Sequence, residues 1–145
     1  MTYNAFTMPL ITRHVVKALI RAVDTGRFFI IRSTIPIMPG WSLVGGGMGV
    51  HENEIDALYR EIKEELRVTK EAFSKIEKRN GIYTSHNHIL GIPITMHNHL
   101  FEVTVPIEAN FKPKPNWEVA ESRWVTETEM NSLLGEHYRK LANHR

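Results

Sequence analysis

The sequence contains no cysteine, which excludes disulfide bonds, thiolate catalysis and zinc sites built on cysteine. It also lacks any run approaching the ~18 uninterrupted apolar residues that a membrane-spanning helix needs. Its mildly apolar start is interrupted by Asn4, Pro9, Arg13 and His14. Neither sign of charge dominates, because the formal net charge is only +2, and so small an excess does not argue for wrapping nucleic acid. These absences predict a cytoplasmic protein with no membrane segment and no stable nucleic-acid complex.

The composition that remains is that of an ordinary folded protein. Hydrophobic residues make up 42% and charged residues 23% of the 145 residues, close to the averages of globular domains. A chain of this length is about one domain's worth. We therefore expect residues 1–145 to form a single domain, and a homodimer is compatible with the sequence.

The hydrophobic pattern predicts several strands and two helices, which implies an α/β or α+β sandwich. Runs of β-branched and aliphatic residues mark strands, and apolar residues at spacings of three and four mark helices. The expected strands are residues 15–23, 28–31, 41–44, 95–105 (with Phe101, Val103 and Val105 on one face) and 122–125. The first expected helix is residues 54–66, with Asn53 as its N-cap and an apolar stripe of Ile55, Leu58, Ile62 and Leu66. The second is a final helix that begins with a Thr126–Glu129 capping box. Its apolar face carries Met130, Leu133, Leu134, Tyr138 and Leu141.

Turn-forming residues separate these elements. Residues 24–26 (Asp-Thr-Gly) predict a hairpin between the first two strands, and Asn80-Gly81 is a second hairpin signal. Prolines make residues 35–40 and 112–115 loops. The glycines at 45, 46, 47 and 49 are expected to break the chain before the helix.

Three glutamates share one face of the predicted helix at 54–66. Glu61, Glu64 and Glu65 stand at i, i+3 and i+4. Without compensation their charges repel and raise at least one carboxyl pKa, whereas a divalent cation would neutralise them. Carboxylate oxygens are the ligands that Mg²⁺ prefers. The pattern therefore suggests a metal-assisted reaction on a phosphate ester, although a solvated acidic face is the commoner fate of an isolated ExxEE.

The residues around these glutamates make a solvated face the weaker explanation. Six positions are spaced as G-x5-E-x7-R-E-x-x-E-E, namely Gly46, Glu52, Arg60, Glu61, Glu64 and Glu65. Such a match arises by chance on the order of 10⁻⁵ over a chain of this length. The segment 45–68 resembles the Nudix box, the signature of hydrolases that cleave a nucleoside diphosphate linked to another group. The lead-in at residues 40–43 and the late Glu121, Trp124 and Val125 also resemble the family's layout.

The resemblance implies a fold, a cofactor and a site. In Nudix proteins the box forms a loop, helix and loop packed on a mixed β-sheet in an α/β/α sandwich. It binds Mg²⁺ or Mn²⁺ while water attacks a phosphorus atom of the diphosphate. Carried over by position, it makes Glu61, Glu64 and Glu65 the metal ligands, with Gly46 offering its backbone carbonyl. It makes Arg60 and Glu52 an ion pair that orients the helix against the glycine loop.

Two positions depart from the family pattern. Arg67 stands where a glycine usually ends the helix, and His51 replaces the glycine before Glu52. A glycine is favoured at a helix end because a positive φ costs it little. Its loss predicts that this helix ends differently, while neither change removes a carboxylate.

Candidates outside the box are each weighed against an ordinary surface or core position. Glu118, ahead of Glu121, is a candidate general base, because some Nudix enzymes send a further carboxylate to the site from the loop before the last strand. Arg32 is a candidate contact for a substrate phosphate, with a solvated strand-end arginine as the alternative. Four aromatic residues are candidates for stacking on a base, though each is more often a core or rim residue: Trp41, Tyr83, Phe101 and Trp117.

Histidines supply a further alternative. His86, His88, His97 and His99 could gather as a transition-metal site, but exposed histidines on strand surfaces are the commoner arrangement without a recognised ligand spacing.

The sequence thus predicts Mg²⁺-dependent hydrolysis of a nucleoside diphosphate derivative, with a nucleoside triphosphate giving a monophosphate and pyrophosphate as the preferred reaction. The run from Trp41 to Leu66 resembles small bacterial nucleoside triphosphate pyrophosphohydrolases in this respect. A nucleotide-sugar or dinucleotide hydrolase is one alternative. A non-catalytic domain that senses nucleotides is another, although a silent descendant has no reason to keep three mutually repelling carboxylates.

Overall fold

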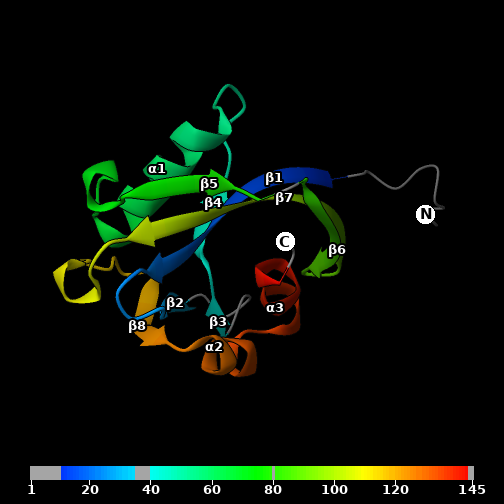
Figure 1. The fold of residues 1–145 in the computed structure, drawn as a ribbon. Coiled ribbons are helices and arrows are strands. Elements are labelled where there is room, and N and C mark those ends of the chain that lie inside the picture. Colours follow the sequence, from blue (N-terminus) through cyan, green and yellow to red (C-terminus); the bar gives the residue numbers. More distant parts are fainter. Residues whose placement is uncertain (1–10, 35–39, 80, 144–145) are drawn as a thin grey trace, which may run out of the picture.

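The computed structural model describes residues 11–34, 40–79 and 81–143. Eight strands of this part form one mixed sheet, with α1 on one side and α2 and α3 on the other (Figure 1). The elements in chain order are β1 Ile11–Ala22, β2 Phe28–Ser33, β3 Trp41–Ser42, β4 Val44–Gly47, α1 Glu54–Leu66, a 3-10 helix Lys70–Ala72, β5 Lys75–Lys78, β6 Tyr83–Ile89, β7 Ile92–Val105, a 3-10 helix Glu108–Asn110, β8 Val119–Val125, α2 Glu127–Leu133 and α3 Glu136–Ala142.

Strand β1 is the centre of the sheet. The order runs β3-β2-β1-β7-β5, and β4 also pairs with β1, β6 with β7, and β8 with β2. β1 and β7 run parallel over the full length from Ile11↔Ile94 to Ala22↔Val105, whereas the other pairs are antiparallel. Because β1 pairs with both β4 and β7, its register is fixed, and so is the face of the sheet to which each of its side chains points.

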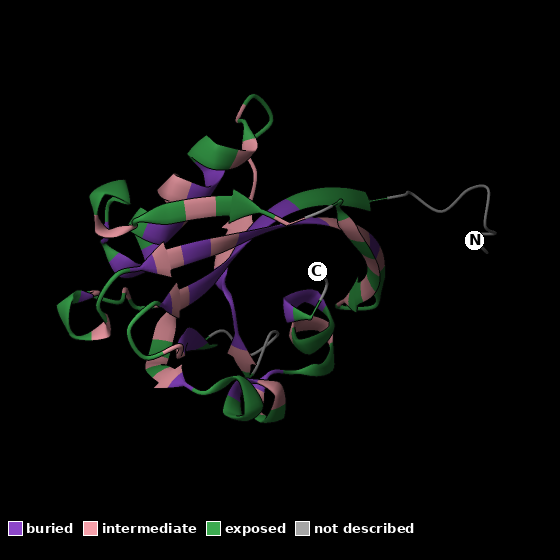
Figure 2. Cartoon of the chain, viewed as in Figure 1, coloured by how far each residue is buried: buried purple, intermediate pink, exposed green. Residues whose placement is uncertain are grey.

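The core has two layers, one on each face of the sheet. Val16, Ala18 and Ile20 of β1 pack with the apolar side of α1, while Leu19 packs with residues of α2 and α3. Successive side chains of a strand point to opposite faces, so a single strand serves both layers. Figure 2 shows the buried residues along the central strands and on the sides of the helices that face them. The expected α/β fold, an α/β/α sandwich around a mixed sheet, is confirmed.

Helix α1 spans the predicted residues 54–66, and the Asn53 side chain accepts a hydrogen bond from Asp56 N, which caps it. Ile55 was expected in the buried stripe but is 39% exposed. Arg67 adopts the left-handed conformation, with φ 55° and ψ 37°, and its N–H donates to Lys63 O. The expectation that the missing glycine would change the helix end is wrong, because arginine takes the backbone geometry that glycine usually provides.

The glycines after Val44 do not break the chain as expected. Gly45, Gly46 and Gly47 belong to β4, which pairs with Val15 to Ala18 of β1. A Cβ at Gly45 would lie 2.0 Å from Val16 O. These glycines therefore permit a close approach of two strands, and the predicted single strand at 41–44 is divided into β3 and β4.

The hairpin expected at Asn80-Gly81 needs correction. Asn80 lies outside the described residues, and β5 and β6, on either side of it, both pair with β7 and not with each other. The tight turn is instead at Leu90 and Gly91, which have φ of 52° and 78° and join β6 to β7. The loop expected at 35–40 also lies largely outside the described residues, at 35–39.

The final helix is two helices. Leu134 is extended and forms a bridge with Trp41. Gly135 is also extended and is the N-cap of α3, so the two helices are separated at a residue of low helix propensity. The Thr126–Glu129 capping box is present at the start of α2, and Met130, Leu134 and Leu141 share one core layer. The hairpin at 24–26 and the strands expected at 95–105 and 122–125 are confirmed, the latter two as parts of longer strands.

None of the helices in the described ranges has the length and apolar character needed to cross a membrane.

Candidate active site

Glu61, Glu64 and Glu65 of α1 differ sharply in their surroundings. Glu65 is buried, the Glu61 side chain is only 13% exposed, and the Glu64 side chain is 56% exposed. This order follows from the helix face, because Glu61 and Glu65 border the buried stripe of Leu58 and Ile62. The sequence pattern predicted one shared face but not this gradient of burial.

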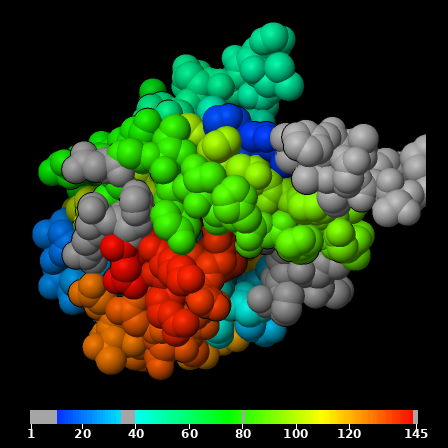
Figure 3. Space-filling view, turned by 90° about the vertical axis from the view of Figure 1, so that its right-hand side faces the viewer, coloured from blue at the N-terminus to red at the C-terminus, as the bar shows by residue number. Residues whose placement is uncertain are grey.

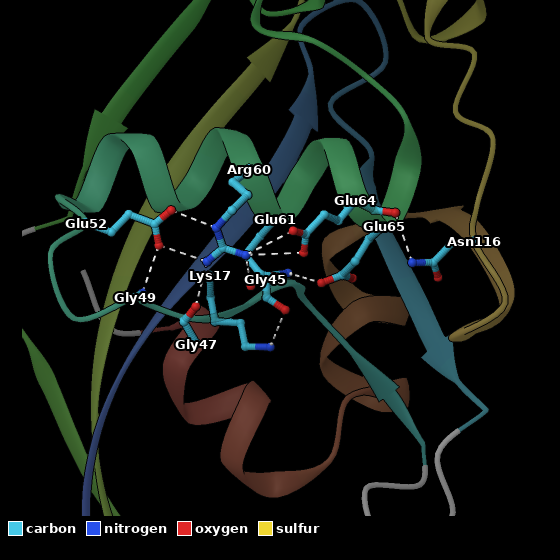
Figure 4. Close-up of polar contacts among 10 residues, drawn as sticks. All are labelled: Lys17, Gly45, Gly47, Gly49, Glu52, Arg60, Glu61, Glu64, Glu65 and Asn116. Atoms are coloured by element: carbon cyan, nitrogen blue, oxygen red, sulfur yellow. Dashed lines mark hydrogen bonds and ion pairs between the residues drawn. The ribbon is translucent and has the colours of Figure 1, made fainter.

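Arg60 lies at the centre of a polar network (Figure 4). Its Nε and Nη2 donate to Glu52 Oε2 and Oε1 at 2.7 and 2.9 Å, and Nη2 also donates to Gly47 O at 2.8 Å. Its Nη1 donates to Glu61 at 2.9 Å and to Glu64 at 3.2 Å. The pair expected between Arg60 and Glu52 is therefore formed, and Arg60 also offsets part of the charge of the glutamate cluster.

Burial governs the acidity of the inner carboxylates. It raises the pKa of Glu65 to about 7, and Lys17 opposes this shift. Glu65 Oε1 accepts one hydrogen bond from Gly45 N at 3.2 Å (Figure 4). Burial also raises the pKa of Glu61, against the attraction of Arg60. A positive charge at this point would favour both ionised forms.

The donor set suits a hard divalent cation. Carboxylate oxygens of Glu61, Glu64 and Glu65 are of the type that Mg²⁺ and Mn²⁺ prefer. Gly46 lies beside them without a Cβ, which would stand 2.6 Å from Glu61 Oε2. In the described part of the chain, however, no three His, Asp or Glu side chains converge on one point, since Glu61 and Glu64 both turn to Arg60. The residues fit such a cation by chemistry, and their side chains would have to turn from Arg60 to hold it.

A cleft of about 200 Å³ adjoins this cluster. The cleft lies between the sheet and α3. Figure 3 shows the face of the molecule on which α3 lies beside β6. The lining of the cleft includes Arg13, Val15, Lys17, Ile31, Ser33, Ser42, Leu43, the glycines 45–47, Glu65, Met96, Glu118, Val119, His137 and Tyr138. Arg13, Lys17 and Tyr138 were not singled out from the sequence, since no local motif marks a cation or a ring for a cleft formed by distant segments.

The loop carrying Glu118 is fastened to the end of α1. Asn116 Nδ2 donates to Glu64 O and Asn116 N donates to Glu65 O, each at 2.9 Å (Figure 4). Asn116 Oδ1 in turn accepts from Glu118 N at 2.9 Å. Glu118 lines the cleft and is close enough to Glu65 to raise its pKa. Asn116 was missed in the sequence because its partners are backbone atoms.

Arg32 and Glu121 lie elsewhere. They are cross-strand partners on β2 and β8, with Arg32 Nε 3.4 Å from Glu121 Oε2, and Glu121 also pairs with Arg123. Ile31 and Ser33 line the cleft, and Arg32 between them points to the other face. Arg32 and Glu121 are therefore not among the residues that line this cleft, whereas Glu118 is.

Among the residues that the structure describes, the histidines do not form a metal site. His99 is buried, contrary to the expectation of a surface position, with Nδ1 2.9 Å from Glu54 Oε1 and Nε2 2.9 Å from His14 Nδ1. His86 and His97 hydrogen-bond to threonines of the neighbouring strand. Of the aromatic candidates, Phe101 is a core residue and Tyr83 packs against the core.

The structure thus combines an α/β/α sandwich with a glycine strand and three helical glutamates beside an open cleft. Residues 12–144 match the family described as NUDIX domain, so the chain belongs to the Nudix hydrolases, which act on nucleoside diphosphate derivatives. No curated protein sequence matches the chain closely enough to count as a relative.

Solved structures share the fold at low sequence identity. The MutT protein of Methanosarcina mazei Go1 is 20% identical with a TM-score of 0.69, over 92% of this chain and 91% of that one. The E. coli dihydroneopterin triphosphate pyrophosphohydrolase is 19% identical with a TM-score of 0.70, over 91% and 94%. A C. elegans Ap4A hydrolase is 19% identical with a TM-score of 0.67, over 89% and 91%.

Proposed function

We propose that this chain is a Mg²⁺- or Mn²⁺-dependent hydrolase that converts a nucleoside triphosphate to a monophosphate and pyrophosphate. The observation that carries the proposal is the position of Glu61 and Glu65, two largely buried carboxylates beside Gly46 at the wall of an open cleft. Buried like charges are costly unless a cation compensates them. One solved structure of the same fold is a triphosphate pyrophosphohydrolase, which agrees with this choice of substrate.

Each part of the site has an assigned task. Glu61, Glu64 and Glu65, with the Gly46 carbonyl, would hold the cation. When bound, a divalent cation supplies positive charge that neutralises phosphate oxygens and acidifies water. Arg60 and Glu52 hold the helix against the glycine strand, so that the carboxylates keep their positions relative to the cleft.

Glu118 is the proposed general base. It lines the cleft beside Glu65, and its carboxylate would accept a proton from the attacking water. The oxygen of that water forms a bond to phosphorus, the bond to the bridging oxygen breaks, and pyrophosphate leaves. Asn116 keeps Glu118 at this place by its bonds to the end of α1.

The test is a substrate panel run with Mg²⁺ and again in excess chelator. It comprises nucleoside triphosphates, nucleotide sugars, dinucleotide polyphosphates and capped RNA, with products separated by chromatography. We expect nucleoside triphosphates to give monophosphate and pyrophosphate only with the cation. Preferential cleavage of a nucleotide sugar or a dinucleotide would overturn the substrate assignment, and full activity in chelator would overturn the metal assignment.

A further inference from the structure

Lys17 is a buried cation with too few partners. Its side chain comes from β1 into the cleft, and the residue is 9% exposed. Among the described residues its Nζ makes one hydrogen bond, to Gly45 O at 3.3 Å, and forms no ion pair within 4.0 Å. An ammonium group has three donors, and a buried one is costly while they are unpaired. The remaining donors are therefore available to an anion in the cleft.

Tyr138 of α3 fixes the position of this ammonium. Lys17 Nζ lies 5.3 Å from the centre of the Tyr138 ring, a cation–π contact that uses no N–H donor. The contact holds the flexible lysine chain against the wall of the cleft. The ammonium is thus held in place without losing its capacity to bind oxygen.

Arg13 extends the same row of side chains along β1. It lines the cleft with Val15 and Lys17, as alternate residues of one strand do. A Cβ at Gly47 would lie 2.7 Å from Arg13 Nη2, so this glycine leaves room for the guanidinium. Arg13 is exposed and forms no ion pair in the part of the chain that the structure describes.

The two cations stand at opposite ends of the glycine strand. Lys17 pairs in register with Gly45. Gly47 pairs in register with Val15, which lies two residues after Arg13 on β1. The Cα atoms of Lys17 and Arg13 are four strand residues apart, about 13 Å at 3.3 Å per residue. Their charged groups lie beside Gly45 and Gly47. Gly46 and the glutamate cluster lie between these ends. A chain of linked phosphates that passes the carboxylates can contact both cations in turn.

We propose that Lys17 and Arg13 form a polyphosphate-binding row that selects substrates with at least three linked phosphates over diphosphates joined to a sugar. This inference rests on the proposed function and specifies its substrate class. Lys17 binds the phosphates beside the carboxylates, and Arg13 binds the far end of the chain. A charge-assisted hydrogen bond to phosphate is strong enough for each cation to change affinity about tenfold.

The test measures binding of inorganic tripolyphosphate and pyrophosphate to the full chain by calorimetry, with Mg²⁺ and again in chelator. The variants are Lys17→Met and Arg13→Gln, and the matched control is Lys75→Met, whose side chain on β5 is 65% exposed and outside the cleft. Methionine replaces a buried charge at similar volume, which is usually tolerated. Arg13 is exposed, so its variant tests the row even if Lys17→Met fails to fold.

We expect wild-type protein to bind tripolyphosphate more tightly than pyrophosphate, and each variant to weaken tripolyphosphate binding about tenfold or more. Arg13→Gln should leave pyrophosphate binding nearly unchanged, and Lys75→Met should change neither. If both variants bound tripolyphosphate with wild-type affinity, the proposal that Lys17 and Arg13 bind the phosphate chain would be wrong. If the variants lost binding but the wild-type protein hydrolysed no nucleoside triphosphate, the polyphosphate-binding row would stand and the proposed function would be wrong. The two failures are therefore distinguishable.

Discussion

The guanidinium of Arg60 holds the carboxylate of Glu52 through two parallel hydrogen bonds of 2.7 and 2.9 Å. This pair joins the middle of α1 to the loop that follows β4, and it lowers the pKa of Glu52 to about 2. Glu52 Oε1 also accepts from Gly49 N at 2.9 Å, so the loop backbone is fastened at the same point. Arg60 thus helps to hold the glycine strand against the glutamates, together with the hydrogen bond from Gly45 N to Glu65.

Arg60→Ala is expected to lower both the melting temperature, by a few degrees, and the rate of hydrolysis. The variant leaves Glu52 without its partner and frees Glu61 and Glu64 to repel each other. Arg123→Ala, which removes a mostly exposed pair with Glu121, is the matched control and should change little. Thermal melts and steady-state kinetics check this; an Arg60→Ala protein equal to wild type in both would show that the pair holds nothing in place.

Glu64→Gln and Glu65→Gln are each expected to cut turnover by at least about a hundredfold while leaving the fold intact, because each removes a ligand charge at constant volume. Glu77→Gln, with a side chain 62% exposed on β5, is the control. Kinetics over a range of Mg²⁺ concentrations and circular dichroism are the measurements. Undiminished hydrolysis by both variants would rule out the assigned metal ligands.

Glu118→Gln is expected to lower kcat strongly, to leave KM nearly unchanged, and to remove the acidic limb of the pH–rate profile. Glu121→Gln is the matched control, because Glu121 is engaged with Arg32 and Arg123 outside the cleft. If Glu118→Gln kept the wild-type kcat and an unaltered pH profile, Glu118 would not be the general base, and the base would be one of the carboxylates of α1.

The free energy of unfolding of metal-free protein is expected to fall as pH rises from about 4.5 to about 7. In this range Glu65, with a pKa of about 7, keeps its proton when folded and loses it when unfolded. The shift corresponds to about 3 kcal/mol at 1.36 kcal/mol per unit. Denaturant titrations in chelator should show the slope in wild type and a flatter dependence in Glu65→Gln. If the free energy of unfolding had the same pH dependence in both proteins, the Glu65 carboxyl would have an ordinary pKa and would be in contact with water.

Arg67→Gly is expected to stabilise the protein by about 1 kcal/mol, because an L-residue pays roughly that amount in the left-handed region. The Arg67 side chain is exposed, so its removal costs little packing. Arg67→Ala keeps the Cβ and serves as the control without this gain. Thermal melts should separate the two variants by roughly 2–4 °C; equal melting temperatures would show that φ of 55° carries no cost here.

Local patterns in the sequence predicted the features that short-range interactions determine. The bounds of α1, its Asn53 cap, and the Thr126–Glu129 capping box follow from helical periodicity and from hydrogen bonds within a few residues. The spacing of Glu61, Glu64 and Glu65 belongs to the same class, since a helix carries its own side-chain geometry. A predicted hairpin failed at Asn80-Gly81 because strand pairing depends on partners far along the chain.

The sequence by itself determined that a helix presents three carboxylates after a run of glycines. Only the tertiary structure decided that Glu65 is buried and that Lys17 and Tyr138, from opposite ends of the chain, meet beside it. It also turned Arg32 away from the cleft. The physical reason is that the face to which a strand residue points depends on its register with distant strands, and a slip of one residue reverses every side chain.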